Sequence, residues 1–150
     1  SMDKIINSKV ISNKLIGLKW ISCMQPHDPK KEVNQLLEAI DIIKNDTAKK
    51  SIITDYQFIS VALSIYDFSQ SHVWFINHVV NQKNESRYYN TYKKFFIKNL
   101  KENKIIKAYL IKPLLGGNEV FEKSLNPDCY EKKKITEILD VYLLKECNEL

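Results

Sequence analysis

The chain is 150 residues long, with 44% hydrophobic and 27% charged residues. This composition is typical of one globular domain and excludes an intrinsically disordered chain. Three glycines and four prolines leave no room for a flexible linker, so we expect one domain over residues 3–150, with Ser1 and Met2 as a cloning remnant. No apolar run approaches the roughly 20 residues of a membrane-spanning helix, and the chain is expected to be soluble.

The formal net charge is +5 at pH 7, from 23 Lys and Arg against 18 Asp and Glu. Arg87 is the only arginine, whereas phosphate and base recognition rely on the planar guanidinium group. The lysines are spread over every segment, often beside Asn or Glu. We therefore interpret them as solvated surface and expect no nucleic-acid partner.

The first half of the chain predicts strands alternating with helices. An apolar, β-leaning run predicts a strand over about residues 16–21. Asp28 and Pro29 then form a helix start, because Asp caps free backbone N–H groups and Pro suits the first helical position. Apolar residues at three- and four-residue spacing carry this helix to about Asn45. A short buried strand follows at residues 51–54.

The second half continues the alternation. A helix from residue 56 follows Asp55 as its predicted N-cap, and a strand is expected at residues 73–76. Further helices are expected over residues 87–101 and 118–125, on either side of a continuous apolar strand at residues 105–111. The apolar residues 135–144 fit either one helix or a strand pair, and we favour a terminal strand around residues 141–144.

Short apolar strands alternating with amphipathic helices are typical of right-handed crossovers and a parallel sheet covered on both faces. The fold expected from the sequence is therefore α/β. It is a Rossmann-like three-layer sandwich, with a mostly parallel sheet of four to five strands and helices on both faces.

In such a sheet, ligands bind beyond the carboxyl ends of the strands, so the loops there predict a ligand-side crevice. Asp55 has two interpretations, as a ligand-binding carboxylate or as a helix cap. The histidines could form an acid–base pair, although loop histidines usually have no such role. The residues expected in the crevice are His27, Asp55, Tyr56, Gln57, Asn77, His78, Gly116 and Gly117.

No catalytic residue is predicted. The first strand is followed by Ser-Cys-Met-Gln-Pro, which lacks the spaced glycines of a dinucleotide-binding turn. The chain also lacks the motifs of P-loop proteins, α/β-hydrolases and zincins. The three cysteines have none of the paired spacings of a zinc site. We therefore expect neither a metal nor a cofactor.

Cys129 and Cys147 bracket the C-terminal segment and allow two interpretations. If the segment turns back on itself, the pair can close a loop of about 18 residues as a disulfide. Alternatively, all three cysteines are buried thiols in a reducing cytoplasm. The residues alone slightly favour the thiols.

Two stretches carry a family resemblance, KKSIITDYQFIS at residues 49–60 and YYNTYKKFFIKNLKENKIIKAYLI at residues 88–111. They resemble the soluble C-terminal domain of some bacterial polytopic membrane glycosyltransferases, relatives of the dolichyl-phosphate-mannose protein mannosyltransferases. The resemblance extends over about residues 14–147. Its most specific parts are the Thr-Asp-Tyr-Gln turn and the Lys-Ile-Ile strand.

The resemblance implies a non-catalytic domain at the periplasmic or extracytoplasmic face of a membrane. Such a domain would bind or position an acceptor or partner, with the membrane-embedded portion of the parent protein as a partner and a sugar or acceptor as ligand. An oxidising compartment favours a Cys129–Cys147 disulfide. The alternative is a free-standing cytoplasmic enzyme or nucleotide-binding protein of Rossmann-like fold.

Overall fold

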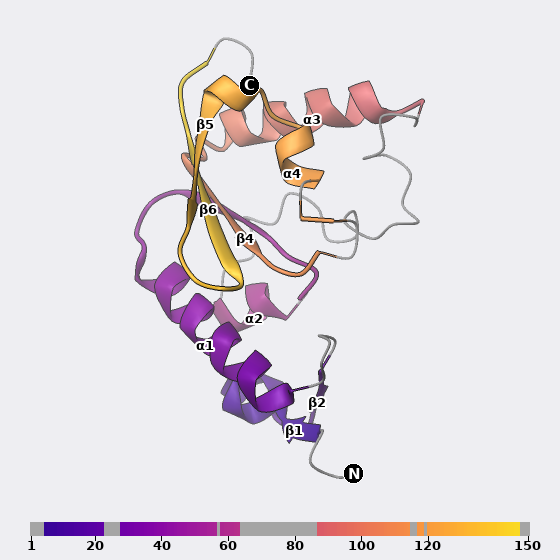
Figure 1. The fold of residues 1–150 in the computed structure, drawn as a ribbon, viewed down its shortest axis with the longest axis vertical. Helices are drawn as coiled ribbons and strands as arrows, with labels where there is room; N and C mark the ends of the chain where they lie inside the picture. The colour runs from indigo at the N-terminus through magenta and orange to yellow at the C-terminus, as the bar shows by residue number, and fades with distance from the viewer. Residues whose placement is uncertain are drawn as a thin grey trace. The chain divides into compact units, whose positions relative to one another are not determined.

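The computed structural model describes residues 5–22, 28–56, 58–63, 87–114, 117–118 and 120–147. The chain divides into two compact units, which are treated separately (Figure 1). The N-terminal unit comprises Ser1–Asp46 and Phe58–Tyr66, and the C-terminal unit comprises Thr47–Gln57 and Asp67–Leu150. Among the described residues, no helix is long and apolar enough to cross a membrane.

The long helix of the N-terminal unit, α1 (Pro29–Asn45), confirms the helix start predicted from the sequence. The Asp28 carboxylate accepts a hydrogen bond from the backbone N–H of Lys31 at 3.0 Å, and Pro29 occupies the first turn. The cap satisfies one of the N–H groups that lack a partner inside a helix. The buried face of α1 includes Leu36, Ala39 and Ile43, which have no solvent exposure.

A small antiparallel ribbon completes the described N-terminal unit together with α2 (Ile59–Leu63). Strand β1 (Ile5–Asn7) pairs with β2 (Lys19–Ile21). Two 3-10 turns, η2 (Ser8–Val10) and η3 (Asn13–Leu15), lie in the connection between the strands. The Trp20 ring packs edge-to-face against Phe58, with 5.0 Å between ring centroids.

The C-terminal unit contains a four-stranded mixed sheet in the order β3-β4-β6-β5. Its strands are β3 (Lys50–Ile53), β4 (Lys107–Ile111), β5 (Tyr130–Lys134) and β6 (Leu139–Leu144). Strands β3 and β4 are parallel, whereas β6 runs antiparallel to both β4 and β5. The strands expected at residues 51–54, 105–111 and 141–144 are therefore confirmed.

The predicted fold class is wrong. The Rossmann-like sandwich required a mostly parallel sheet of four to five strands, but among the strands that the structure describes only the β3–β4 pairing is parallel. The predicted first strand also belongs to a different sheet, because β2 pairs with β1 and not with β3. The described part of the chain is a small α/β structure with one two-stranded and one four-stranded sheet. The predicted strand at residues 73–76 lies outside the described residues.

Helix α3 (Tyr89–Glu102) and the short helix α4 (Val120–Lys123) pack on one face of the four-stranded sheet. Register places Ile53, Leu110 and Ala108 on this face, because Ile53 is opposite Leu110 and residues two apart in a strand share a face. Phe96 from α3 and Phe121 from α4 contact one another edge-to-face at 5.6 Å. This apolar cluster is the core of the C-terminal unit.

Candidate functional site

The structure describes three of the eight residues expected in the crevice, namely Asp55, Tyr56 and Gly117. Asp55 and Tyr56 follow β3, and Gly117 follows β4, so they come after the carboxyl ends of two parallel neighbours. The other five, His27, Gln57, Asn77, His78 and Gly116, lie outside the described residues. That these residues together form a crevice stays a prediction.

Asp55 does not precede a helix directly, as the sequence had suggested. Helix α2 begins at Ile59, and Asp55 lies in a bend. The backbone N–H of Tyr56 donates to the Thr54 hydroxyl at 3.0 Å, which is a local turn that competes with helix formation at this point.

A group of paired ionisable side chains lies between α4 and the sheet, toward the carboxyl end of β4. Glu122 Oε1 accepts hydrogen bonds from Lys132 Nζ at 2.6 Å and from the Tyr142 hydroxyl at 2.7 Å. Asp140 is almost fully buried, and its two oxygens lie 3.1 Å from Lys112 Nζ and 3.6 Å from Lys132 Nζ. We call these five residues the polar network.

The pKa shifts in the polar network follow from this pairing. Burial raises the pKa of Tyr142, and its hydrogen bond to Glu122 raises it further. The hydrogen bond to Glu122 raises the pKa of Lys132 despite burial. Burial acts to raise the pKa of Glu122, but the hydrogen bonds from Lys132 and Tyr142 outweigh it and hold that pKa below its usual value.

The polar network is suited to holding α4 on the sheet. Two carboxylates face two ammonium groups, so the formal charges cancel, and Glu122 accepts from both of its neighbours. The pKa of Glu122 is lowered and those of Lys132 and Tyr142 are raised, so these three groups keep the forms they have at neutral pH, whereas a general acid or base needs a pKa near the working pH. We therefore assign the network a structural role.

The opposite end of the sheet is closed by a disulfide between Cys129 and Cys147. Their Cα atoms are 5.7 Å apart, which confirms the prediction that the C-terminal segment doubles back. Cys129 ends the 3-10 turn η5 (Pro127–Cys129), and Cys147 lies beyond β6. The backbone N–H of Lys145 also donates to the carbonyl of Cys129 at 2.9 Å, so this segment is held at two points.

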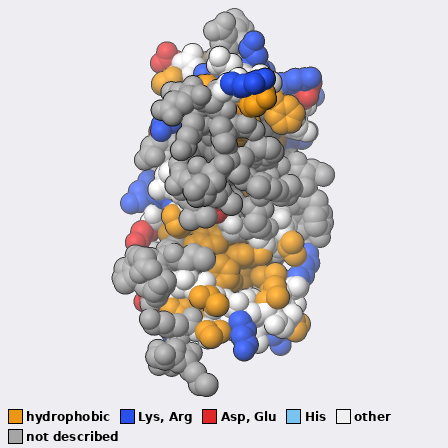
Figure 2. Space-filling model, turned by 90° about the vertical axis from the view of Figure 1, so that its right-hand side faces the viewer, with side chains coloured by type: hydrophobic (Ala, Val, Ile, Leu, Met, Phe, Trp, Pro, Cys, Tyr) orange, Lys and Arg blue, Asp and Glu red, His pale blue; other side chains and the backbone are white. Residues whose placement is uncertain are grey.

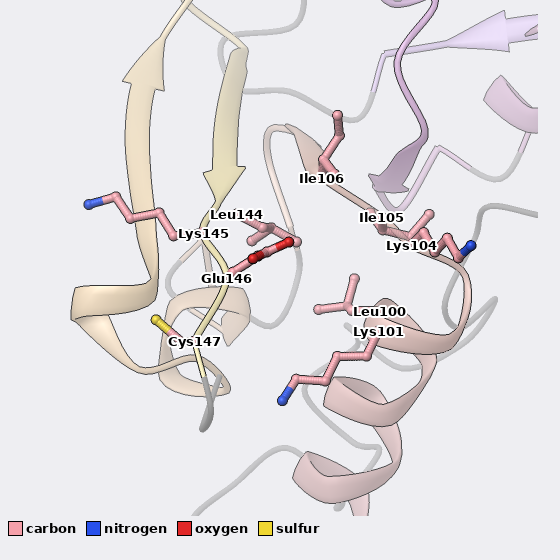
Figure 3. Close-up of a pocket in the computed structure, with 9 residues that line it drawn as sticks. All are labelled: Leu100, Lys101, Lys104, Ile105, Ile106, Leu144, Lys145, Glu146 and Cys147. Atoms are coloured by element: carbon pink, nitrogen blue, oxygen red, sulfur yellow. The ribbon is translucent and has the colours of Figure 1, made fainter.

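A pocket of about 720 Å³ opens beside this disulfide (Figure 3). Its walls come from the end of α3, from residues 104–106 just before β4, and from residues 144–147 at and after the end of β6. The apolar part of the lining comprises Leu100, Ile105, Ile106 and Leu144. Its volume lies in the range of sites that hold small organic ligands.

The wall between α3 and β4 is built by the way α3 ends. The backbone N–H of Ile105 donates to the Leu100 carbonyl, and that of Lys104 donates to the Lys101 carbonyl, both at 2.9 Å. This is a Schellman motif, in which the residue after the cap takes a left-handed conformation and apolar residues on either side of the turn meet. Lys104 has φ of 52°, and Leu100 and Ile105 are both buried in the core cluster.

Polar groups stand at the mouth of this apolar pocket. Figure 3 shows the Glu146 carboxylate turned into the space between Leu144 and Ile105, while Lys101 extends across the opening toward Cys147. Lys104 and Lys145 also line the pocket, but their ammonium groups point outward. A carboxylate accepts hydrogen bonds and an ammonium donates them. The pocket can therefore hold a ligand that has hydroxyl groups beside an apolar part.

Sequence reasoning missed this pocket because it applied a rule for parallel sheets. That rule places ligands at the carboxyl ends of the strands, whereas this pocket lies at the amino end of β4 and the carboxyl end of β6. The signal in the sequence that could have indicated the pocket was the pair of cysteines. A Cys129–Cys147 disulfide requires the segment after residue 144 to lie beside residue 129, where the last hairpin begins.

Among the described residues, no group of three or more His, Cys, Asp or Glu side chains could hold a metal ion. Comparison with protein-family models, with curated proteins and with solved structures found no match. The family resemblance at residues 49–60 and 88–111 stays a prediction.

Proposed function

We propose that this chain is a non-catalytic, extracytoplasmic domain of a membrane glycosyltransferase, and that the pocket beside Cys129–Cys147 binds the acceptor or partner. The observation that carries the proposal is the pocket itself, in which an inward carboxylate stands against aliphatic walls. The partner implied by the resemblance is the membrane-embedded portion of the parent protein.

The lining indicates the kind of ligand. Glu146 can accept hydrogen bonds from two hydroxyl groups, and Lys101 can donate to a ring or glycosidic oxygen. Leu144, Ile105 and Ile106 offer aliphatic surface to the apolar part of the same molecule. A sugar joined to an apolar group has both features, and we propose this as the class of acceptor.

The disulfide supports the extracytoplasmic part of the proposal, because disulfides persist in oxidising compartments and are rare in the cytosol. The chain has three cysteines, of which two are bonded in the structure. Protein exported to an oxidising compartment should contain one alkylatable thiol, counted by mass spectrometry without reduction. Three alkylatable thiols in such material would contradict the extracytoplasmic assignment.

The binding proposal is tested by calorimetric titration with octyl glucoside below its micelle concentration. We expect saturable binding that is tighter than the binding of free glucose, because the octyl group reaches the aliphatic walls. Glu146→Ala should weaken the binding about fivefold to tenfold, since it removes charged hydrogen bonds.

The matched control is Glu131→Ala, which removes an exposed carboxylate of β5 outside the pocket lining. This control should bind like the unmodified chain. Equal affinity for glucose and octyl glucoside, or equal loss in both variants, would contradict the pocket as the binding site.

A further inference from the structure

A second surface, in the N-terminal unit, has a composition that the pocket does not explain. Residues 5–22 contain three lysines and no aspartate or glutamate. The same stretch carries most of its large aliphatic side chains in solvent, including Ile16 at 64% and Ile21 at 66% exposure. The exposed members, which we call the ribbon patch, are Ile5, Val10, Ile16, Leu18 and Ile21.

The strand register holds two of these side chains outward. Ile5 and Ile21 are directly opposite one another in the antiparallel β1–β2 pair, so they lie on the same face of the ribbon. The next pair, Ile6 and Trp20, lies on the other face, where the Trp20 indole N–H donates to Glu32 of α1 at 3.4 Å. The contact of Trp20 therefore determines which face of the ribbon packs against α1, and Ile5 and Ile21 lie on the opposite, exposed face.

The connection between the strands adds the remaining aliphatic side chains. Asn7 and Ser12 cap its two 3-10 turns by accepting from the backbone N–H groups of Lys9 and Lys14. Gly17 has φ of 89°, a conformation that a glycine adopts without strain. The hydrogen bonds of these turns thus hold the aliphatic side chains of the patch in exposed positions. Lys9 and Lys19 are exposed in the same stretch of chain.

Figure 2 shows hydrophobic side chains gathered on one face of the N-terminal unit, in the lower part of the view, with lysines at their border. Contiguous exposed apolar surface of this kind marks an interaction site. The three lysines of residues 5–22 favour a partner that is negatively charged where the apolar side chains insert.

Two kinds of protein partner fit this chemistry poorly. Interfaces between proteins are enriched in aromatic residues and arginine, whereas the ribbon patch contains only Ile, Val and Leu beside lysine. A symmetric dimer through the patch would bring it against its own copy, lysines included. An anionic bilayer interface offers both negative charge and an apolar region. Its headgroups can pair with the lysines, and its acyl chains can contact the short aliphatic side chains.

We propose that the ribbon patch docks the N-terminal unit on the headgroup region of a bilayer that contains anionic lipid. Aliphatic side chains enter the boundary between headgroups and acyl chains, and the lysines remain at the level of the phosphates.

The test is sedimentation of the full chain with vesicles of phosphatidylcholine containing about 30% phosphatidylglycerol, an anionic content chosen to give a negative surface potential. We expect binding that falls with added salt and is weaker on vesicles of phosphatidylcholine alone. Lys9→Gln/Lys19→Gln should weaken it about 25-fold, at roughly fivefold for each lysine. Lys14 is kept, because its ammonium donates to the Val61 carbonyl at 3.3 Å.

Two matched controls separate the patch from net charge and from general hydrophobicity. Lys94→Gln/Lys98→Gln makes the same charge change on α3 and should bind as the unmodified chain does. Ile5→Ser/Ile21→Ser should lose binding, while Phe95→Ser/Ile135→Ser, which changes exposed residues of the C-terminal unit, should keep it. Far-ultraviolet circular dichroism checks that each variant is folded.

Equal losses in the patch variants and their controls would overturn the proposal. So would a patch-dependent dimer in analytical ultracentrifugation with no vesicle binding. Neither result bears on the pocket, because none of the substituted residues lines it. Conversely, loss of octyl glucoside binding in Glu146→Ala leaves the vesicle result unchanged.

Discussion

The two ends of the four-stranded sheet show opposite ways of using charge. Toward the carboxyl end of β4, the polar network pairs each carboxylate with an ammonium group and holds α4 on the sheet. At the amino end, Glu146 and Lys101 stand at the mouth of an apolar pocket. The first arrangement stabilises the fold, and in the second the Glu146 carboxylate faces a space that a ligand can fill.

This difference has a lesson for locating sites. Shifted pKa values are a common guide to functional residues, and here they mark Glu122, Lys132 and Tyr142 of the polar network, together with Tyr130, whose ring contacts that of Tyr142. Structural ion pairs shift pKa values too. The open geometry at the other end is the better indication of binding.

The largest effect on stability and binding is expected from removal of the disulfide, at the end of the sheet that carries the pocket. Cys129→Ser/Cys147→Ser should lower the free energy of unfolding by about 3 kcal/mol, because the bond closes a loop of 18 residues. It should also abolish octyl glucoside binding, since the segment that carries Glu146 loses its anchor. Urea unfolding and calorimetry measure the two effects. Unchanged binding in a folded variant would show that the bond does not shape the pocket.

A smaller effect is expected at the opposite end, from Tyr142→Phe. Loss of the hydroxyl that donates to Glu122 should cost about 1.5 kcal/mol in the free energy of unfolding. Ligand binding at the pocket should not change. A loss of octyl glucoside affinity as large as that of Glu146→Ala would show that the two ends are not independent.

The same variant tests the pH dependence. Because the folded state raises the pKa of Tyr142 above its usual value near 10, the contribution of the neutral phenol to stability is complete below pH 10. It is lost as the pH rises further. The stability difference between the unmodified chain and Tyr142→Phe should therefore shrink above pH 10 in urea titrations. A difference that stays constant or grows would contradict the assignment.

The smallest effect is expected at Lys104. Its φ of 52° is a conformation that favours glycine. Lys104→Gly should raise the free energy of unfolding by about 0.5–1 kcal/mol, and it should leave octyl glucoside affinity unchanged because the Lys104 ammonium points away from the pocket. Destabilisation by this change would mean that the side chain contributes packing that the end of α3 needs.

Much of the local structure could be predicted from the sequence, but the pairing of strands could not. Helices α1 and α3 have regular apolar spacing, and β4 is a continuous apolar run, so burial alone indicates them. Strand β5 has the sequence Tyr-Glu-Lys-Lys-Lys with four exposed residues, and nothing in that pattern indicates a strand. A strand pair was one interpretation of residues 135–144, but without β5 the final hairpin could not be placed, and the alternation of strands and helices suggested a parallel sheet.

The candidate site likewise has a part that could be predicted from the sequence and a part that could not. The Cys129–Cys147 bond was one of two interpretations of the sequence, and it is present. The pocket beside it depends on long-range pairing, since Leu144 and Ile106 become neighbours only when β6 pairs antiparallel to β4. Residues that a sheet brings together across about 40 positions leave no local pattern to detect.

The most direct test is to map amide chemical-shift changes in the full chain as octyl glucoside is added below its micelle concentration. The changes should concentrate at residues 100–106 and 144–147, which build the pocket, and spare residues 110–112 and 139–142 at the other end of the sheet. Changes centred on the polar network, or none up to the micelle concentration, would contradict the assignment of the binding site.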